Sequence, residues 1–270
     1  MPISTFSDKV AAITGTGSGI GEALAISLAQ QGCAVAIADI DADKLKHTAS
    51  QIRGAAVSSH LVDVADRAQM EQFAKNVVAH HGRVNMVFNN AGVSLTDTVS
   101  HMSYKNFEWL MDINFWGVVY GSKAFLPYLE QVSEAQIINV SSIFGVIAVP
   151  TQAAYNASKF AVRGFTYAMR EELIDTNIGV SCVQPGGVKT NIAEAARYFP
   201  SENTSASKEE FTAKFEVIAK LTPLQAAEQI LRGVLQNKTQ ILVGRDAKVL
   251  ATIERLLPVS YLKVLRAIWS

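Results

Sequence analysis

The sequence predicts an α/β fold, with a doubly wound parallel sheet of about seven strands, helices on both faces, and a single domain over residues 1–270. Short β-branched runs alternate with longer segments at helical spacing from the start of the chain. The runs are continuously apolar, which is typical of parallel strands buried on both faces. With 270 residues, 49% hydrophobic and 18% charged, the chain can bury such a core.

The expected strands and helices alternate along the chain. The expected strands are Val10–Thr14, Ala34–Asp39, Val57–Asp63, Val84–Asn89, Gln136–Ser141, Gly179–Gln184 and Gln240–Val243. The expected helices are Gly19–Gln31, Asp41–Arg53, Asp66–His81, Ser103–Gln131, Gln152–Thr176 and Pro223–Asn237. No linker or internal repeat divides them, so right-handed crossovers within one sheet are expected.

Two segments fall outside this alternation. Gly187–Thr222 has helical spacing at Ile192–Phe199 and Phe211–Leu221 around a polar middle, Ser201–Lys208. A long excursion inside a compact domain is usually a functional loop, so we expect a substrate lid over 187–222.

The second segment is the C-terminal extension, residues 245–270. Its apolar side chains recur at helical spacing on both sides of Pro258, with basic residues at other positions. The segment is expected to be an amphipathic helical extension. It could cover the substrate cleft, form a subunit contact or lie on an anionic membrane surface, and packing is favoured over the membrane.

Composition excludes several classes of function. Lys+Arg and Asp+Glu both number 24, so no basic face for nucleic acid is expected, and little self-repulsion opposes self-association. Cys33 and Cys182 lie in apolar runs as expected for reduced thiols, and the five histidines lack metal-ligand spacing. Without a signal peptide or a long apolar run, a cytoplasmic location is expected.

A glycine-rich turn follows the first strand and opens the first helix. Such a turn lets the backbone approach a pyrophosphate at a helix N-terminus, although glycines also serve plain turns. Its position predicts a Rossmann-like dinucleotide site whose contacts are Gly15, Thr16, Ser18, Gly19, Ile20 and Gly21.

The second strand ends at Asp39, roughly 20 residues beyond the glycines, with Ile40 next to it. A carboxylate there can accept both ribose hydroxyls and would repel a 2′-phosphate, so NAD is favoured over NADP. Alternatively, Asp39 merely caps the following helix. Asp63 and Val64 end the third strand, and Asn90, Ala91 and Gly92 follow the fourth, where ligands bind in doubly wound sheets.

Residues 8–190 closely resemble the short-chain dehydrogenases/reductases, and the resemblance continues loosely to about 244. Tyr155 to Lys159 matches the Tyr-x-x-x-Lys motif of that family, and Ser142 lies thirteen residues earlier, as in the family. The other matches are the Thr14–Gly21 turn, the Asn89–Gly92 stretch, the helix asparagine Asn114, and Pro185-Gly186 with Thr190. The resemblance implies NAD-dependent alcohol oxidation or carbonyl reduction, and commonly a homodimer or homotetramer.

It also implies roles for single residues. Tyr155 would move the alcohol proton, Lys159 would hold the nicotinamide ribose, and Ser142 would hydrogen-bond the substrate oxygen. Asn114 would interrupt its helix and hold a water that links Lys159 to solvent. The carboxamide would be fixed by the segment that contains Pro185, Gly186, Val188 and Thr190.

The chemistry of the Tyr155–Lys159 pair can be argued from the residues alone. Four residues apart on one helix, the two side chains share a face, although a solvated surface pair has the same spacing. A phenol with a pKa of about 10 is a poor base near neutrality. A neighbouring ammonium and the positive nicotinamide would lower that pKa, as general acid–base catalysis requires.

The substrate is predicted from the segments that line the pocket in the family. These are Val93–Val99, Ile143–Pro150 and the lid, and they are rich in apolar side chains. They favour an apolar secondary alcohol or ketone, or they simply pack under the lid. The alternative function is a non-catalytic NAD-binding redox sensor on the same fold, which would not need all four of Asn114, Ser142, Tyr155 and Lys159.

Overall fold

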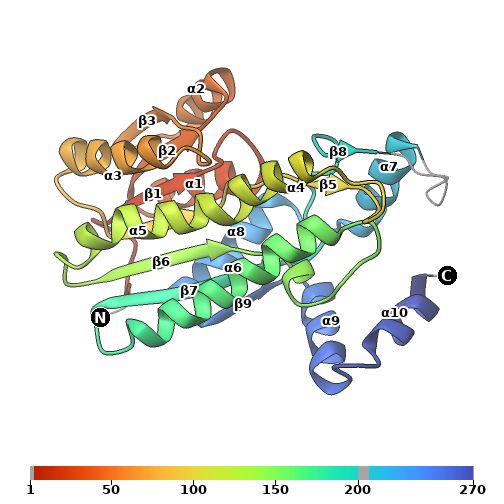
Figure 1. Ribbon diagram of the computed structural model, residues 1–270. Helices are drawn as coiled ribbons and strands as arrows, with labels where there is room; N and C mark the ends of the chain where they lie inside the picture. The colour runs from red at the N-terminus through yellow and green to blue at the C-terminus, as the bar shows by residue number, and fades with distance from the viewer. Residues whose placement is uncertain (1–2, 200–206, 270) are drawn as a thin grey trace.

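The computed structural model describes residues 3–199 and 207–269, and it contains the expected seven-stranded parallel sheet (Figure 1). The strand order is β3-β2-β1-β4-β6-β7-β9. The strands are β1 (Val10–Thr14), β2 (Ala34–Asp39), β3 (Val57–Leu61), β4 (Met86–Asn89), β6 (Ala135–Val140), β7 (Ile178–Pro185) and β9 (Gln240–Val243).

The bounds differ from the expected ones at four strands: β6 and β7 differ by one residue at each end, whereas β4 begins and β3 ends two residues inside the expected range. β4 begins at Met86 instead of Val84, and just before it the Asn85 side chain accepts a bond from the Val10 N–H and donates one to the Glu134 carbonyl. β3 ends at Leu61 instead of Asp63, because the Asp63 carboxylate accepts the Ala65 N–H and so forms a turn.

Helices cover both faces of the sheet. α1 (Gly19–Gln30), α2 (Ala42–Gln51) and α8 (Pro223–Leu235) share one apolar core with the sheet, and α3 (Arg67–His81), α5 (Gly117–Leu129) and α6 (Ala153–Glu172) share a second core on the opposite face. Side chains of β1 alternate between these cores, so both faces of the strand are buried. Figure 1 shows α5 and α6 in front of the sheet.

The order of the strands creates a switch point in the middle of the sheet. The chain moves outward from β1 through β2 to β3, and then returns to pair β4 with the other side of β1. Connections leave β1 and β4 toward opposite faces, which opens a crevice at the carboxyl ends of these strands. The glycine turn and Asn90 both lie at this crevice.

The segment Ser103–Gln131 is not the continuous α-helix expected. It contains α4 (Tyr104–Met111), the π-helical turn η1 (Asp112–Trp116) and α5. The interruption places the buried Asn114 against the Val93 backbone, with which its side chain forms two hydrogen bonds. The resemblance to the family had implied this interruption, whereas the helical periodicity had not.

The lid also differs from its expected structure. Ile192–Phe199 is not helical: Arg197–Tyr198 forms β8, which pairs in parallel with β5 (Leu95–Thr96). The N–H groups of Arg197 and Phe199 donate to carbonyls of that neighbouring segment, which outweighs local helical periodicity. α7 (Lys208–Ile218) corresponds to the second expected helix, and residues 201–206 of the polar middle lie outside the described residues.

Beyond the sheet, the chain forms α9 (Arg245–Leu256) and α10 (Tyr261–Trp269), two helices on either side of Pro258 as expected. Both lie at one end of the molecule, beside the 3-10 turn η2 (Ile143–Gly145) that precedes α6 (Figure 1). Within residues 3–199 and 207–269, no helix combines the length and the apolar character that crossing a membrane requires.

Candidate active site

The glycine turn after β1 is packed so closely that side chains are excluded from it. A Cβ atom on Gly21 would lie 2.1 Å from the Gly15 carbonyl oxygen, and one on Gly15 would lie 2.7 Å from the Ala91 Cα. Gly15 and Gly19 have positive φ, which other residues rarely adopt. Ser18 is the N-cap of α1, and the first N–H groups of the helix, from Gly19, Ile20 and Gly21, have no acceptor within it, which suits a pyrophosphate. Thr16 is buried below the turn, where its N–H and its hydroxyl both donate to the Ala38 carbonyl.

Asp39 lies next to this turn. Its carboxylate accepts the Gly17 N–H at 2.7 Å and the Asp41 N–H at 3.0 Å. The N-cap of α2 is Asp41, whose side chain accepts the Asp43 and Lys44 N–H groups. Asp39 therefore does not cap that helix, and its charge lies at the crevice, with the exposed Ile40 beside it.

Residues after β4 close the other side of the crevice. The Thr14 hydroxyl accepts the N–H groups of Asn90 and Ala91, each at 3.1 Å. The Asn90 side chain donates in return to the Thr14 and Gly15 carbonyls. These bonds hold the glycine turn and the Asn90–Gly92 stretch as one unit.

The remaining residues of the predicted nucleotide site lie around this unit. Thr190 lies against the turn, since its Cγ2 would be 3.0 Å from a Cβ on Gly19. Val188 pairs with Leu221, so the two ends of the lid meet just beyond Pro185 and Gly186 at the end of β7. Val64, which follows Asp63, packs against Gly117. The structure thus brings the glycine turn, Asp39, Asn90 and Thr190 to one edge of the sheet.

Tyr155 and Lys159 lie one turn apart on α6, and both are buried. The Lys159 ammonium donates to the Val140 carbonyl at 3.1 Å and lies 5.6 Å from the centre of the Tyr155 ring. A Cβ on Gly92 would be 3.4 Å from the same ammonium, so Lys159 reaches the nucleotide side of the crevice. Their burial excludes a solvated surface pair.

The pKa of Tyr155 is shifted in the direction opposite to the expected one. Burial raises the pKa of Tyr155 to about 12, and the hydrogen bond with Ser142 opposes that rise. Burial also lowers the pKa of Lys159 to about 8. The tyrosine pKa is thus raised where a lowering was expected, because desolvation is the largest effect on it and the Lys159 ammonium is directed to the Val140 carbonyl.

Ser142 and Asn114 complete the group. Ser142 ends the connection from β6, and its Oγ accepts the Phe144 N–H at 3.1 Å while interacting with Tyr155. Asn114 holds the Val93 backbone and donates to the Ser158 hydroxyl at 3.3 Å. The structure therefore brings the four predicted catalytic residues together, from η1, α6 and the end of β6.

Apolar side chains surround Tyr155. Leu95, Leu110 and Ala154 are buried beside it, and Phe144 packs edge-on against its ring with centroids 6.1 Å apart. Other partly buried members of this cluster come from α4, the lid and neighbouring loops: Val93, Met102, Phe107, Trp109, Ile192 and Phe199. A reacting group near Tyr155 would be shielded from water and would meet an apolar surface.

Sequence reasoning missed the role of Asn156. Its buried side chain donates to the Phe144 and Ile147 carbonyls at 2.7 and 2.8 Å and accepts the Val149 N–H at 3.1 Å. It therefore holds the segment between Ser142 and Tyr155 in shape. The only signal in the sequence was a polar residue beside Tyr155 that would face inward on the helix.

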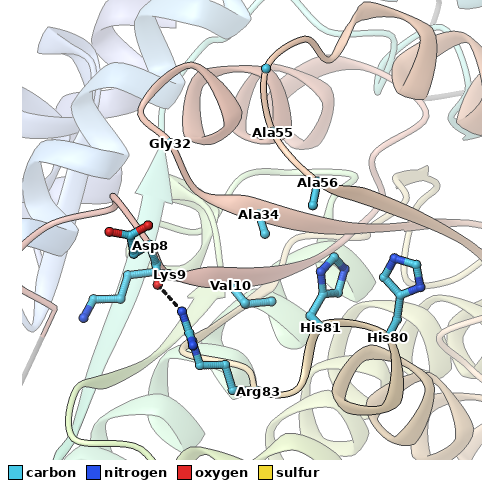
Figure 2. Close-up of a pocket in the computed structure, with 11 residues that line it drawn as sticks. Asp8, Lys9, Val10, Gly32, Ala34, Ala55, Ala56, His80, His81 and Arg83 are labelled. Carbon is cyan, nitrogen blue, oxygen red and sulfur yellow. Dashed lines mark hydrogen bonds between the residues drawn. The ribbon is translucent and has the colours of Figure 1, made fainter.

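A hollow of about 460 Å³ lies at the opposite edge of the sheet from these residues (Figure 2). Its lining includes Val10 and Ala34, the first residues of β1 and β2, with Arg83 donating to the Asp8 carbonyl at 2.6 Å. Because ligands in doubly wound sheets bind at the carboxyl ends of the strands, this hollow is not the nucleotide site. Among the described residues no group of histidines, cysteines and carboxylates could hold a metal ion.

Comparison with known proteins agrees with this geometry. The family model for short chain dehydrogenases matches residues 9–200. SadH of Mycobacterium tuberculosis, named as an oxidoreductase, is 42% identical over 269 residues, which cover 98% of this chain and 96% of SadH. Since only 26 residues follow Gly244, this match takes in most of the C-terminal extension.

Two solved structures are also similar. A short-chain dehydrogenase/reductase from Burkholderia phymatum, in complex with NAD, has a TM-score of 0.88 at 28% identity and covers 94% of this chain and 95% of its own. An alcohol dehydrogenase from Thermococcus sibiricus, complexed with 5-hydroxy-NADP, has a TM-score of 0.73 at 27% identity and covers 87% of this chain and 95% of its own. The similar structures therefore include complexes with both kinds of nucleotide.

Proposed function

Because the chain belongs to the short-chain dehydrogenase family, we propose that it interconverts an apolar secondary alcohol and its ketone with NAD(H), using Tyr155 as general acid and base. The observation that carries the proposal is the burial of Tyr155 between Ser142 and Lys159 inside an apolar cluster. No purely sensory role requires a phenol, a hydroxyl and an ammonium in this arrangement.

The proposed chemistry divides between the residues around Tyr155. In oxidation, Tyr155 accepts the hydroxyl proton of the substrate, and in reduction it returns that proton. Ser142 hydrogen-bonds the substrate oxygen as charge develops on it. Bound nicotinamide supplies the acceptor or donor of the hydride. Lys159 holds the nicotinamide ribose, and Asn114 orders the water that connects Lys159 to solvent.

The high pKa of Tyr155 gives Lys159 a second task in this proposal. A phenol with a pKa of about 12 is almost wholly protonated at neutral pH, so a positive charge nearby must favour the phenolate during oxidation. The Lys159 ammonium is the cation beside the Tyr155 ring. Oxidation should therefore speed up with rising pH until Lys159 itself loses its proton, near its pKa of about 8.

The nucleotide proposed is NAD. Support comes from the Asp39 carboxylate, which the Gly17 and Asp41 N–H groups hold at the crevice, where it can accept ribose hydroxyls and repel a 2′-phosphate. The glycine turn, Asp63, Val64 and Asn90–Gly92 would hold the adenosine and pyrophosphate. Thr190 and the Val188 backbone would fix the carboxamide so that one ring face meets the substrate, and Pro185 and Gly186 would contact the nucleotide beside them.

The test is a panel of alcohols and ketones with NAD(H) and NADP(H), followed at the nicotinamide absorbance, for the wild type and for Tyr155→Phe. We expect turnover of apolar secondary alcohols, and a loss in kcat of about 10³-fold in the variant, the scale of general acid–base catalysis. Tyr167→Phe removes a hydroxyl from the same helix and serves as the matched control. Full activity in Tyr155→Phe would refute the mechanism, and preference for small polar alcohols would refute the substrate class.

A further inference from the structure

The segment between Ser142 and α6, residues 143–149, is called the Ser142 loop below. Every backbone N–H from Phe144 to Val149 has an acceptor. Five of these acceptors lie on Ser142, on Ile143 or on Asn156 of α6. The sixth is remote in sequence, because the Ala148 N–H donates to the Tyr261 hydroxyl of α10 at 3.1 Å.

Tyr261 is firmly seated in this position. Its side chain is 9% exposed, and Leu265 one turn later is 2% exposed. Both pack in one apolar cluster with Ile143, Val146 and Ile147, and α9 contributes the buried Ala247. The buried faces of α9 and α10 therefore pack against the Ser142 loop, which lies beside α9 in Figure 1.

Phe144 connects this cluster to the reacting centre. Its side chain packs on the cluster of Tyr261 and also on the cluster that contains Tyr155. Its N–H donates to the Ser142 Oγ, and its ring lies edge-on against Tyr155. A shift of the Ser142 loop would consequently move both the hydroxyl of Ser142 and the apolar surface beside Tyr155.

The other end of the extension contacts the lid. The Asp246 carboxylate, in the first turn of α9, accepts the Gly187 N–H at 2.6 Å. Gly187 is the residue at which the lid begins, and its carbonyl accepts the Leu221 N–H from the end of the lid. One continuous segment, Asp246 to Tyr261, thus connects the start of the expected lid to the Ser142 loop.

From these contacts we infer that Tyr261 is a positioning residue for the proposed reaction: its hydroxyl, acting through Ala148, sets the Ser142 loop and thereby the site for the apolar part of the alcohol. The inference rests on the proposed function, and it assigns the C-terminal extension to the substrate cleft. Specificity would then depend on a helix more than 100 residues beyond Tyr155 in sequence.

The sharpest variant is Tyr261→Phe, which keeps the ring in its cluster and removes only the acceptor of the Ala148 N–H. Losing one partly buried hydrogen bond should raise the KM for the alcohol about five-fold and speed hydrogen exchange of the Ser142 loop by a similar factor. The KM and the Kd for NAD(H) should stay within about two-fold, because Tyr261 binds and packs against the Ser142 loop and α9.

Two controls separate positioning from general stability. Tyr104→Phe removes a phenol hydroxyl that is 88% exposed, and should change nothing. Leu265→Ala removes packing from α10 but leaves the Ala148 N–H its acceptor, so we expect a lower Tm with little change in alcohol KM. If Leu265→Ala and Tyr261→Phe gave the same pattern, the hydroxyl would have no positioning role.

The two readouts also keep this inference separate from the proposed function. Failure of the wild type to oxidise any alcohol would refute the proposed function, while exchange at residues 143–149 would still test the Tyr261 contact. An unchanged exchange rate at Ala148 in Tyr261→Phe would overturn the inference even in a fully active enzyme. If hydrogen exchange became faster in Tyr261→Phe but the KM for the alcohol did not change, Tyr261 would have no role in positioning the substrate.

Discussion

The nucleotide side and the substrate side of the crevice are built in different ways. On the nucleotide side, main chain packs directly against main chain, so a Cβ on Gly15 or Gly21 has no room, and the side chains of Asp39 and Asn90 bind the backbone of the turn. On the proposed substrate side, single side chains hold loops: Asn156 and Tyr261 bind the Ser142 loop, and Asp246 binds Gly187 at the start of the expected lid.

This difference indicates which side of the crevice can tolerate amino-acid substitutions. Main-chain packing tolerates almost no substitution at Gly15 and Gly21, since a Cβ there collides with a neighbouring main chain. Loops held by side chains can change shape when a single supporting residue changes, which leaves the nucleotide site undisturbed. The two halves should therefore respond to mutation independently, and the following predictions test that independence.

The largest effect is expected for Gly21→Ala on the nucleotide side. Its Cβ would meet the Gly15 carbonyl oxygen at 2.1 Å, so the turn must move and its N–H groups lose the pyrophosphate. We expect the Kd for NADH, measured by fluorescence, to rise more than about 100-fold, equal to roughly 3 kcal/mol. Gly164→Ala on α6 is the matched control, because nothing lies within 4 Å of its Cβ and alanine favours helices.

Asn156→Ala should give the next largest effect, confined to the substrate side. The change leaves two carbonyls and one N–H of the Ser142 loop without their partner, which should lower the free energy of unfolding by about 3 kcal/mol. We expect kcat/KM for the alcohol to fall about 30-fold, while the Kd for NADH barely changes. Asn76→Ala on the exposed face of α3 is the control, and an equal loss of NADH binding in Asn156→Ala would contradict the independence of the two halves.

Asp39→Asn tests the choice of nucleotide with a smaller expected effect. The amide keeps the shape and one acceptor oxygen for the Gly17 N–H, but removes the charge that would repel a 2′-phosphate. The ratio of kcat/KM for NAD to that for NADP should fall about ten-fold, which corresponds to about 1.4 kcal/mol. A ratio that did not change would mean that the carboxylate has no part in the preference.

The smallest effect concerns stability at the outer edge of the nucleotide side. Burial of His60 on β3, with His80 and His81 nearby, lowers its pKa from 6.5 to about 4, and Ser58 bridges the rings of His60 and His81. The unfolded chain therefore takes up the proton first, so the free energy of unfolding should fall as pH drops from 6.5 toward 4.

Because His60 is only half-buried, the loss should be about 1 kcal/mol. Urea unfolding at pH 7 and pH 5 would measure it, and His60→Asn should flatten the difference whereas the exposed His47→Asn should not. If the free energy of unfolding fell more between pH 7 and pH 5 in His60→Asn than in the wild type, the prediction would be wrong.

The same comparison explains how far the sequence predicted the structure. The sheet, its order of elements and the family were predicted and are confirmed, because continuous apolar runs and glycine turns express local constraints. The positions of Asp39, Ser142, Tyr155 and Lys159 also match, because each follows from spacing along one strand end or helix. Their catalytic and binding roles remain predictions.

Features that depend on remote partners were not predictable. Arg197–Tyr198 has helical periodicity but forms a strand, because the carbonyls of Ser94 and Thr96 offer partners that the local sequence does not reveal. Likewise, Asn156 and Tyr261 bind the Ser142 loop only because the fold brings α6 and α10 to it. Burial, which opposes the expected lowering of the Tyr155 pKa, is also a property of the assembled fold.

The π-helical turn at Asp112–Trp116 has a consequence for how insertions and deletions are tolerated. A π turn holds one residue more than an α-helix between the same flanks. Removing one residue from it would let α4 and α5 join as a regular helix, with their core-facing sides still in register. The protein should then still fold, but Asn114 should no longer point inward. Deletion of a single codon would therefore remove part of the candidate site without unfolding the protein.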